Sequence, residues 1–144
     1  MHSFITIGTL NCQGLNDFYK RSEIFDSLRK SDLSIILLQE TKLHPERERI
    51  YMNEWHGDSI FNSVVGSKSG TAILINKTSI TFSKGSKMTD VEGRVIAVDM
   101  EMFGTRFHVV NSYGPNESRL KIPFLNRLHL YLNSNVTILW GGRS

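Results

Sequence analysis

Four consecutive aliphatic residues at positions 35–38 are followed at once by the polar residues Gln39, Glu40 and Thr41. An apolar run this short, bounded by polar residues, is typical of a strand that is buried on both of its faces. Such a strand needs a packing layer on each side, so the chain is expected to fold around a central sheet. The same feature places a carboxylate, Glu40, beside the core, where an unpaired charge is costly.

The rest of the sequence alternates predicted strands and helices. Hydrophobic residues recur with a period of two from Ile96 to Met102, which predicts a strand with one face toward the core. Asp17 suits the N-cap of a helix, and Pro45 suits a first helical turn. The predicted strands span 4–11, 33–39, 60–65, 71–76, 80–87, 94–103, 106–113 and 136–140, and the predicted helices span 17–30, a segment from Pro45, and a segment after 114–115 that carries Pro123 in its first turn and ends at 133–135. This order predicts a layered fold of the α/β class.

Length and composition exclude several classes of protein. The 144 residues argue for one domain, and 40% hydrophobic with 22% charged residues is ordinary for a globular chain. A single cysteine excludes an internal disulfide framework. No apolar run approaches the roughly 18 residues of a membrane span, and the first ten residues do not resemble a signal peptide, so we expect no membrane partner and a nuclear or cytoplasmic location. The net charge of +3 permits a polyanionic partner without requiring one, and nothing indicates an oligomeric state.

Polar clusters follow three of the predicted strands. They begin at Asn11, at Gln39 and at Asn111, and the third includes Tyr113. In layered α/β folds, ligand sites collect at the carboxyl ends of strands, where loops converge over a rigid sheet. Glu40 is the strongest candidate for chemistry, because Mg²⁺ prefers hard oxygen ligands and often takes only one or two protein carboxylates. The alternative is that Glu40 caps the helix that follows or pairs with a lysine.

The other candidates each have a structural alternative. Asn11 could bind an anion or orient a carboxylate, but asparagine is also a common turn residue. Tyr113 could donate its hydroxyl to a phosphate oxygen, or it could pack at a hairpin end. We expect His108 to be a structural histidine within its strand, and Cys12 to be a small buried residue. Scattered basic residues, Arg94 among them, could line a phosphate path or form a solvated face.

Four motifs together resemble the endonuclease/exonuclease/phosphatase superfamily. In chain order they are Leu10-Asn11-Cys12-Gln13-Gly14-Leu15, Leu37-Leu38-Gln39-Glu40-Thr41, Ser69-Gly70-Thr71-Ala72-Ile73-Leu74 and Asn111-Ser112-Tyr113-Gly114-Pro115-Asn116. Their order and spacing match the family over essentially the whole chain. The first and last motifs most resemble the endonuclease domains encoded by non-LTR retrotransposons, in the N-terminal part of that domain.

The resemblance implies a four-layer α/β sandwich and metal-dependent phosphodiester cleavage of DNA. By match to the family's motifs, Asn11 would help position the active-site network, and Glu40 would bind Mg²⁺. Tyr113 would contact the scissile phosphate. A metal of this kind stabilises charge on the phosphoryl and leaving oxygens.

The sequence departs from the family after its last predicted strand. The family continues there with Gly-Asp-x-Asn and closes on Ser-Asp-His, whereas here Gly142 is followed by Arg143 and Ser144. We therefore expect residues 1–144 to form a partial, C-terminally truncated domain that is inactive or impaired alone. Loss of an acid-base group costs on the order of 10²–10⁴-fold in rate. A non-catalytic nucleic-acid-binding remnant is the alternative, and a phosphatase acting on lipid or small-molecule phosphates is less favoured.

Overall fold

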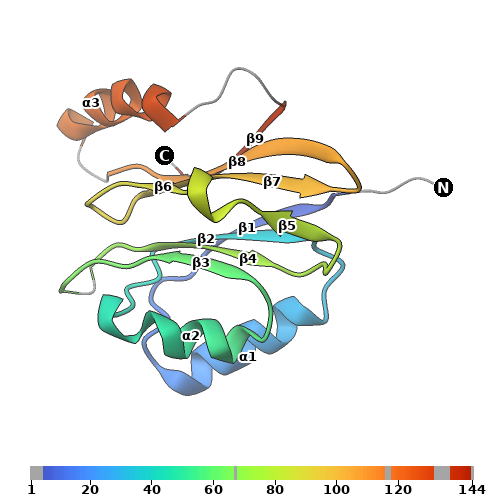
Figure 1. Cartoon of the computed structure of the whole chain (residues 1–144). Coiled ribbons are helices and arrows are strands. Elements are labelled where there is room, and N and C mark those ends of the chain that lie inside the picture. Colours follow the sequence, from blue (N-terminus) through green and yellow to red (C-terminus); the bar gives the residue numbers. More distant parts are fainter. Residues whose placement is uncertain (1–4, 67, 116–117, 132–136, 144) are drawn as a thin grey trace.

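Two β-sheets pack face to face, and helices cover the outer face of each (Figure 1). The computed structural model describes residues 5–143 except 67, 116–117 and 132–136. The layers run helix, sheet, sheet, helix, so the predicted layered α/β class is confirmed. Within the described part of the chain, no helix has the length and apolar character needed to cross a membrane.

The first sheet, sheet A, contains the strand from which the fold was predicted. Its order is β1-β2-β4-β3, with β1 parallel to β2 and the other neighbours antiparallel. All five residues of β2 are buried, as predicted for a strand covered on both faces. The bounds are β1 Ile7–Asn11, β2 Ile35–Gln39, β3 Ser59–Asn62 and β4 Thr71–Ile75.

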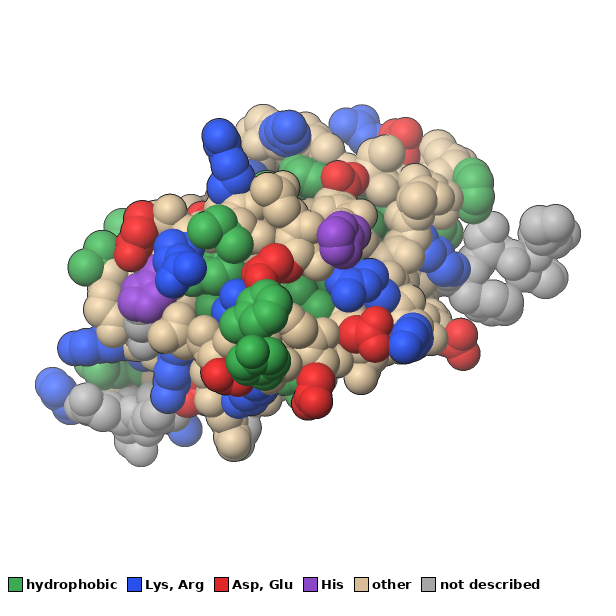
Figure 2. Space-filling model, turned by 90° about the horizontal axis from the view of Figure 1, so that it is seen from below, with side chains coloured by type: hydrophobic (Ala, Val, Ile, Leu, Met, Phe, Trp, Pro, Cys, Tyr) green, Lys and Arg blue, Asp and Glu red, His purple; other side chains and the backbone are tan. Residues whose placement is uncertain are grey.

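Helices α1 (Phe18–Arg29) and α2 (Glu48–Trp55) cover the outer face of sheet A. Asp17 caps α1 as predicted, since its side chain accepts a hydrogen bond of 2.8 Å from the Lys20 amide. Pro45 opens a short 3₁₀ turn, η1 (Pro45–Arg47), directly before α2. Figure 2 shows acidic and basic side chains interspersed over the face that these helices form, so this face carries no patch of one charge.

The second sheet, sheet B, has the order β5-β7-β8-β9, with β6 paired to β7. Its strands are β5 Ile80–Phe82, β6 Met88–Thr89, β7 Val95–Met102, β8 Thr105–Tyr113 and β9 Thr137–Arg143. The predicted strand 80–87 was too long, because the chain turns at η2 (Lys84–Ser86). In that 3₁₀ turn the Ser86 amide donates to the Ser83 carbonyl instead of to a neighbouring strand.

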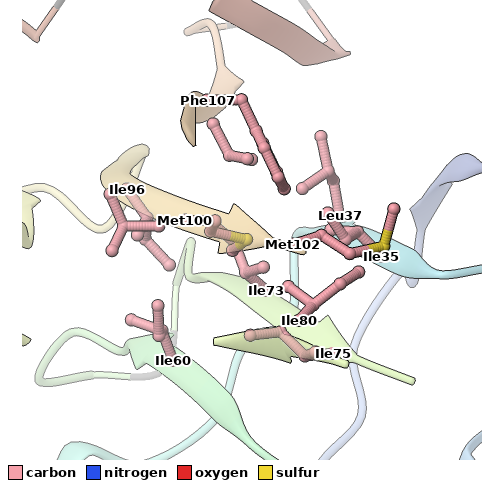
Figure 3. Close-up of a cluster of buried hydrophobic side chains, with 12 residues drawn as sticks. Ile35, Leu37, Ile60, Ile73, Ile75, Ile80, Ile96, Met100, Met102 and Phe107 are labelled. Carbon is pink, nitrogen blue, oxygen red and sulfur yellow. The ribbon is translucent and has the colours of Figure 1, made fainter. Parts of the chain in front are cut away.

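The core between the sheets is apolar and comes from alternating residues of both sheets (Figure 3). The even-numbered residues of β7 face this core, as their period predicted, while Ala97 faces the opposite way. The buried members are Ile35, Leu37, Ile60, Ile73, Ile75, Ile80, Ile96, Val98, Met100, Met102, Phe107 and Val109. This apolar interior holds the two sheets together through burial of apolar surface.

Helix α3 (Ser118–Leu128) lies on the outer face of sheet B and corrects one prediction. Pro123 was expected in the first helical turn, but it lies inside α3. A proline in a helix interior is unfavourable, and here the burial of Phe124 and Leu128 against sheet B offsets that cost. A 3₁₀ turn, η3 (His129–Tyr131), follows α3, and the predicted helix end at 133–135 lies outside the described residues.

Candidate functional site

The predicted polar clusters lie at the carboxyl ends of strands from both sheets. Asn11 is the last residue of β1, Gln39 is the last residue of β2, and Tyr113 is the last residue of β8. The parallel register of β1 and β2 places Asn11 directly beside Gln39. Glu40 follows Gln39, so this edge of the sandwich gathers the residues that the sequence singled out.

Glu40 has a left-handed backbone conformation, with φ of 55°. A side chain with a Cβ adopts this conformation at a cost, so surrounding contacts must hold it. Its carbonyl accepts a hydrogen bond of 2.8 Å from the Gly14 amide, and the next amide, that of Thr41, donates to the Gly70 carbonyl over 3.1 Å. The residue is thus fixed between the loop that follows β1 and the loop that precedes β4.

The Glu40 carboxylate has one partner from each of two directions. Tyr113 Oη donates to Oε2 over 3.4 Å, and Lys42 Nζ lies 3.4 Å from Oε1. Glu40 is 23% exposed, and Lys42 is 43% exposed. The lysine pairing was one of the two alternatives for Glu40. The other does not occur, because neither η1 nor α2 has a side-chain cap.

Asn11 forms a turn at the end of β1. Its side-chain oxygen accepts a hydrogen bond of 3.0 Å from the amide of Gln13, a residue whose φ is 52°. This is the turn role that competed with anion binding. The turn keeps Asn11 at the rim, one strand away from Gln39, and so close to the position at which Glu40 leaves the sheet.

Arg94 contacts Tyr113 in two ways, and the sequence had placed it only among scattered basic residues. The guanidinium carbon lies 5.6 Å from the centre of the Tyr113 ring, a cation–π distance. Nη1 donates to the Tyr113 carbonyl over 3.3 Å, and Nε lies 3.4 Å from Oε2 of Glu92. Arg94 therefore brings a second positive charge to the side of Tyr113. Its position at the start of the predicted strand 94–103, which forms a hairpin with the strand that ends at Tyr113, was the available signal.

A buried pair of amide side chains, Gln39 and Asn111, lies beneath Glu40 and Tyr113. We name this pair the amide bridge. Gln39 Nε2 donates to Asn111 Oδ1 over 3.0 Å, from sheet A to sheet B. Asn111 Nδ2 in turn donates to the carbonyls of Leu38 and Ala72, each at 2.9 Å. The sequence had marked both residues only as members of polar clusters, because a single sequence does not reveal pairing between them.

Two other residues have the structural roles predicted for them. His108 is buried, and its ring nitrogens contact Oδ1 of Asp99 at 2.7 Å and the Tyr131 carbonyl at 2.6 Å. Cys12 is 4% exposed. Burial raises the pKa of its thiol to about 12, so the thiol is uncharged at neutral pH.

The donor set around Glu40 is small. Within residues 5–143 as described, no three histidine, cysteine or acidic side chains group closely enough to hold a metal ion. A cavity of about 530 Å³ lies at the opposite end of sheet A, where Trp55 and Ile75 line it, and the predicted site residues do not contribute to it. The site is therefore an open rim where the Glu40 carboxylate meets Lys42 and the Tyr113 phenol, with Arg94 on the side of Tyr113.

Two proteins are similar to this chain in sequence. The "Transposon TX1 uncharacterized 149 kDa protein" of Xenopus laevis is 26% identical over 141 residues, which is 96% of this chain and 11% of that protein. The "Exodeoxyribonuclease" of Bacillus subtilis is 30% identical over 118 residues, which is 76% of this chain and 42% of that enzyme. The chain thus spans less than half the length of either relative. No protein-family model matches the sequence.

Solved structures share the fold at low sequence identity. The human Nocturnin catalytic domain superposes with a TM-score of 0.68 at 11% identity, over 96% of this chain and 62% of that structure. An AP endonuclease from Archaeoglobus fulgidus gives a TM-score of 0.61 at 20% identity, over 96% of this chain and 56% of that structure. The chain therefore has the fold of the endonuclease/exonuclease/phosphatase superfamily, and its sequence is similar over nearly all of its length to a transposon-encoded protein.

Proposed function

We propose that this chain supplies the metal-binding and phosphate-contacting part of an endonuclease-type site that hydrolyses phosphodiester bonds in DNA. The observation that carries the proposal is the meeting of Glu40 and Tyr113 at one edge of the sandwich, from two different sheets. Support also comes from the nuclease names of two similar proteins, an exodeoxyribonuclease and an AP endonuclease.

Glu40 would hold the Mg²⁺ ion. Its carboxylate offers hard oxygen atoms and remains 23% exposed, and its contacts with the described residues Lys42 and Tyr113 are long, at 3.4 Å, so its lone pairs can accept a cation. Mg²⁺ commonly binds through one or two carboxylates and completes its shell with water and substrate phosphate. The bound ion would stabilise negative charge on the phosphoryl and leaving oxygens.

The neighbouring side chains would bind and orient the phosphate. Tyr113 carries a hydroxyl that can donate to a phosphate oxygen once the carboxylate engages the metal. Lys42 lies 3.4 Å from Glu40, and with 43% of its side chain exposed it is able to swing toward a bound phosphate. Asn11 fixes the turn after β1 and so shapes the rim beside Gln39.

We expect little turnover from this chain alone. The described residues bring one carboxylate to the rim and no group of three metal-ligating side chains. The mechanism needs a group that activates the attacking water, and a site without one loses on the order of 10²–10⁴-fold in rate. The chain would then bind metal and DNA more readily than it cleaves DNA.

Nicking of supercoiled plasmid with and without Mg²⁺ tests this proposal. The wild-type chain is expected to nick only in trace amounts, and Glu40→Gln should remove that trace. Glu23→Gln, which changes an exposed acid on α1, is the matched control and should behave as wild type. Nicking that persists undiminished in Glu40→Gln would contradict the assignment of the site. Efficient nicking lost in Glu40→Gln would support the site and contradict the expected impairment.

One observation favours a non-catalytic alternative. The ion pair with Lys42 already neutralises Glu40, so the rim could bind a nucleic-acid phosphate without metal. Measuring DNA affinity against salt concentration distinguishes the two functions. A non-catalytic binder should show a steep negative salt slope, with an affinity that Mg²⁺ does not raise and Glu40→Gln does not lower. Binding that strengthens with Mg²⁺ only when Glu40 is present favours the metal-dependent function.

A further inference from the structure

We propose that the amide bridge of Gln39 and Asn111 is the positioning device that sets the separation of Glu40 and Tyr113. This proposal rests on the proposed function only in treating Glu40 and Tyr113 as site residues. The hydrogen bonds of the amide bridge do not depend on that function. Glu40 directly follows Gln39, and Tyr113 lies two residues after Asn111 on the same strand. Each half of the bridge is thus attached to one of the two site residues.

The contact between Glu40 and Tyr113 is too weak to fix their positions alone. Its 3.4 Å length exceeds the roughly 2.5–2.7 Å of a strong hydrogen bond between a hydroxyl and a carboxylate. Both side chains also have competing partners, Lys42 for the carboxylate and Arg94 for the ring. Something else must hold the two strand ends at this distance.

The apolar core holds the two sheets together, but it does not by itself fix how one sheet is placed over the other. Burial of apolar surface favours contact between the sheets, but it specifies their relative slide only through side-chain shape. Leu37 and Val109 belong to this core and lie two residues before Gln39 and Asn111 respectively. The amide bridge therefore replaces apolar contact at the last inter-sheet layer before the rim.

Directional bonds at that layer connect four strands. Asn111 of β8 accepts from Gln39 of β2, and it donates to carbonyls of β2 and β4 through Leu38 and Ala72. Gln39 Nε2 also lies 2.9 Å from Thr9 Oγ1 of β1. Hydrogen bonds weaken steeply when bent or stretched, so this set defines the register of sheet B over sheet A at the site.

Both residues of the amide bridge are buried, so water cannot easily take the place of a missing partner. Asn111 is 0% exposed and Gln39 is 1% exposed, so water does not replace a lost partner without opening the core. In any other placement of sheet B over sheet A, the buried amide groups would lose their partners and stay unsatisfied, which is costly. Removing one amide by mutation takes away this preference for the native placement. The amide bridge thus favours one arrangement of Glu40 and Tyr113 at the rim, whereas the apolar core between the sheets alone does not.

The test measures whether Glu40 still affects the environment of Tyr113 after one residue of the amide bridge is mutated. The chain is labelled with 3-fluorotyrosine, and the Tyr113 signal among its four tyrosines is assigned with Tyr113→Phe. The readout is the change in the Tyr113 fluorine shift caused by Glu40→Gln. This coupling is measured in the wild-type, Gln39→Met and Asn111→Leu backgrounds. Val98→Ala, which trims the apolar inter-sheet core, is the matched control.

We expect Gln39→Met and Asn111→Leu to reduce the coupling to less than about half of its wild-type size, whereas Val98→Ala leaves it unchanged. Gln39→Met decides the matter if Asn111→Leu does not fold, because it leaves the two bonds from Asn111 to carbonyls in place. Full coupling in folded Gln39→Met, or equal loss in Val98→Ala, would overturn the inference. So would the absence of any coupling in wild type.

This outcome is separable from that of the proposed function. If the coupling falls in the bridge variants but Glu40 binds no metal, the positioning role is supported and the metal-dependent function is contradicted. Metal binding at Glu40 with coupling indifferent to the bridge would do the reverse.

Discussion

The phenol oxygen of Tyr113 lies 3.4 Å from Oε2 of Glu40, although the two residues are 73 positions apart and lie at the ends of strands in different sheets, Tyr113 as the last residue of β8 and Glu40 directly after β2. The contact spans the sandwich at its rim, beyond the last layer of the apolar core between the sheets. A carboxylate in that place faces both the interior and solvent. The balance of forces on Glu40 therefore follows from its immediate neighbours, and each of them can be varied.

Lys42 competes with any cation for Glu40. Its ammonium lies 3.4 Å from Oε1, so metal binding must break this ion pair and accept a nearby positive charge. Lys42→Met is expected to tighten Mg²⁺ binding several-fold, measured by titration calorimetry. Lys30→Met, which removes a lysine paired with Asp26 on the exposed face of α1, should leave the affinity unchanged. Weaker Mg²⁺ binding in Lys42→Met would show that the lysine assists the ion.

The left-handed backbone of Glu40 predicts a conflict between stability and function. Glycine adopts φ of 55° without steric cost, whereas alanine pays the same cost as glutamate. Glu40→Gly should therefore be more stable than Glu40→Ala by about 1 kcal/mol, measured by urea unfolding. The two variants lose the same carboxylate, so their difference isolates the backbone. Equal stability would mean that the conformation stores no strain.

Cys12 reports on opening of the site edge through its thiol chemistry. Because burial raises its pKa to about 12, the folded chain should react with a thiol reagent only as fast as it opens. The folded chain keeps the proton where the unfolded chain, with a thiol pKa of 9.0, has lost it. The free energy of unfolding should therefore fall as pH rises from about 9 toward 12.

Cys12→Ala is the control for this pH dependence, and it should flatten the loss of stability over that range. Rapid labelling of the native wild-type chain near neutral pH would contradict the buried, uncharged thiol.

Much of the fold could be predicted from the local sequence, because the hydrophobic periodicity of a strand and the capping residue of a helix are set by residues close together in the chain. The apolar run at 35–38 specified β2, and Asp17 specified the start of α1. The predicted strand 80–87 was too long because of the local 3₁₀ turn η2, whereas the other error arose where tertiary packing overrode local preference. Pro123 lies inside α3 because burial of Phe124 and Leu128 holds the helix against sheet B.

The site was predictable as a set of residue types and less so as a geometry. Glu40 and Tyr113 could be selected because polar residues after buried strands converge at one edge. The partnership of Gln39 with Asn111 depends on how one sheet lies over the other, and no local period encodes it. The stacking of Arg94 on Tyr113 likewise arises from strand pairing, since the Tyr113 amide donates to the Arg94 carbonyl.

NMR can show directly whether a divalent metal ion binds at Glu40. Mn²⁺, a paramagnetic substitute for Mg²⁺, broadens amide signals close to where it binds. We predict selective broadening at residues 40–42 and at Tyr113 in the wild-type chain, reversed by excess Mg²⁺ and absent from Glu40→Gln. Broadening that is centred elsewhere, or that persists in Glu40→Gln, would contradict the placement of a metal and phosphate site at this rim.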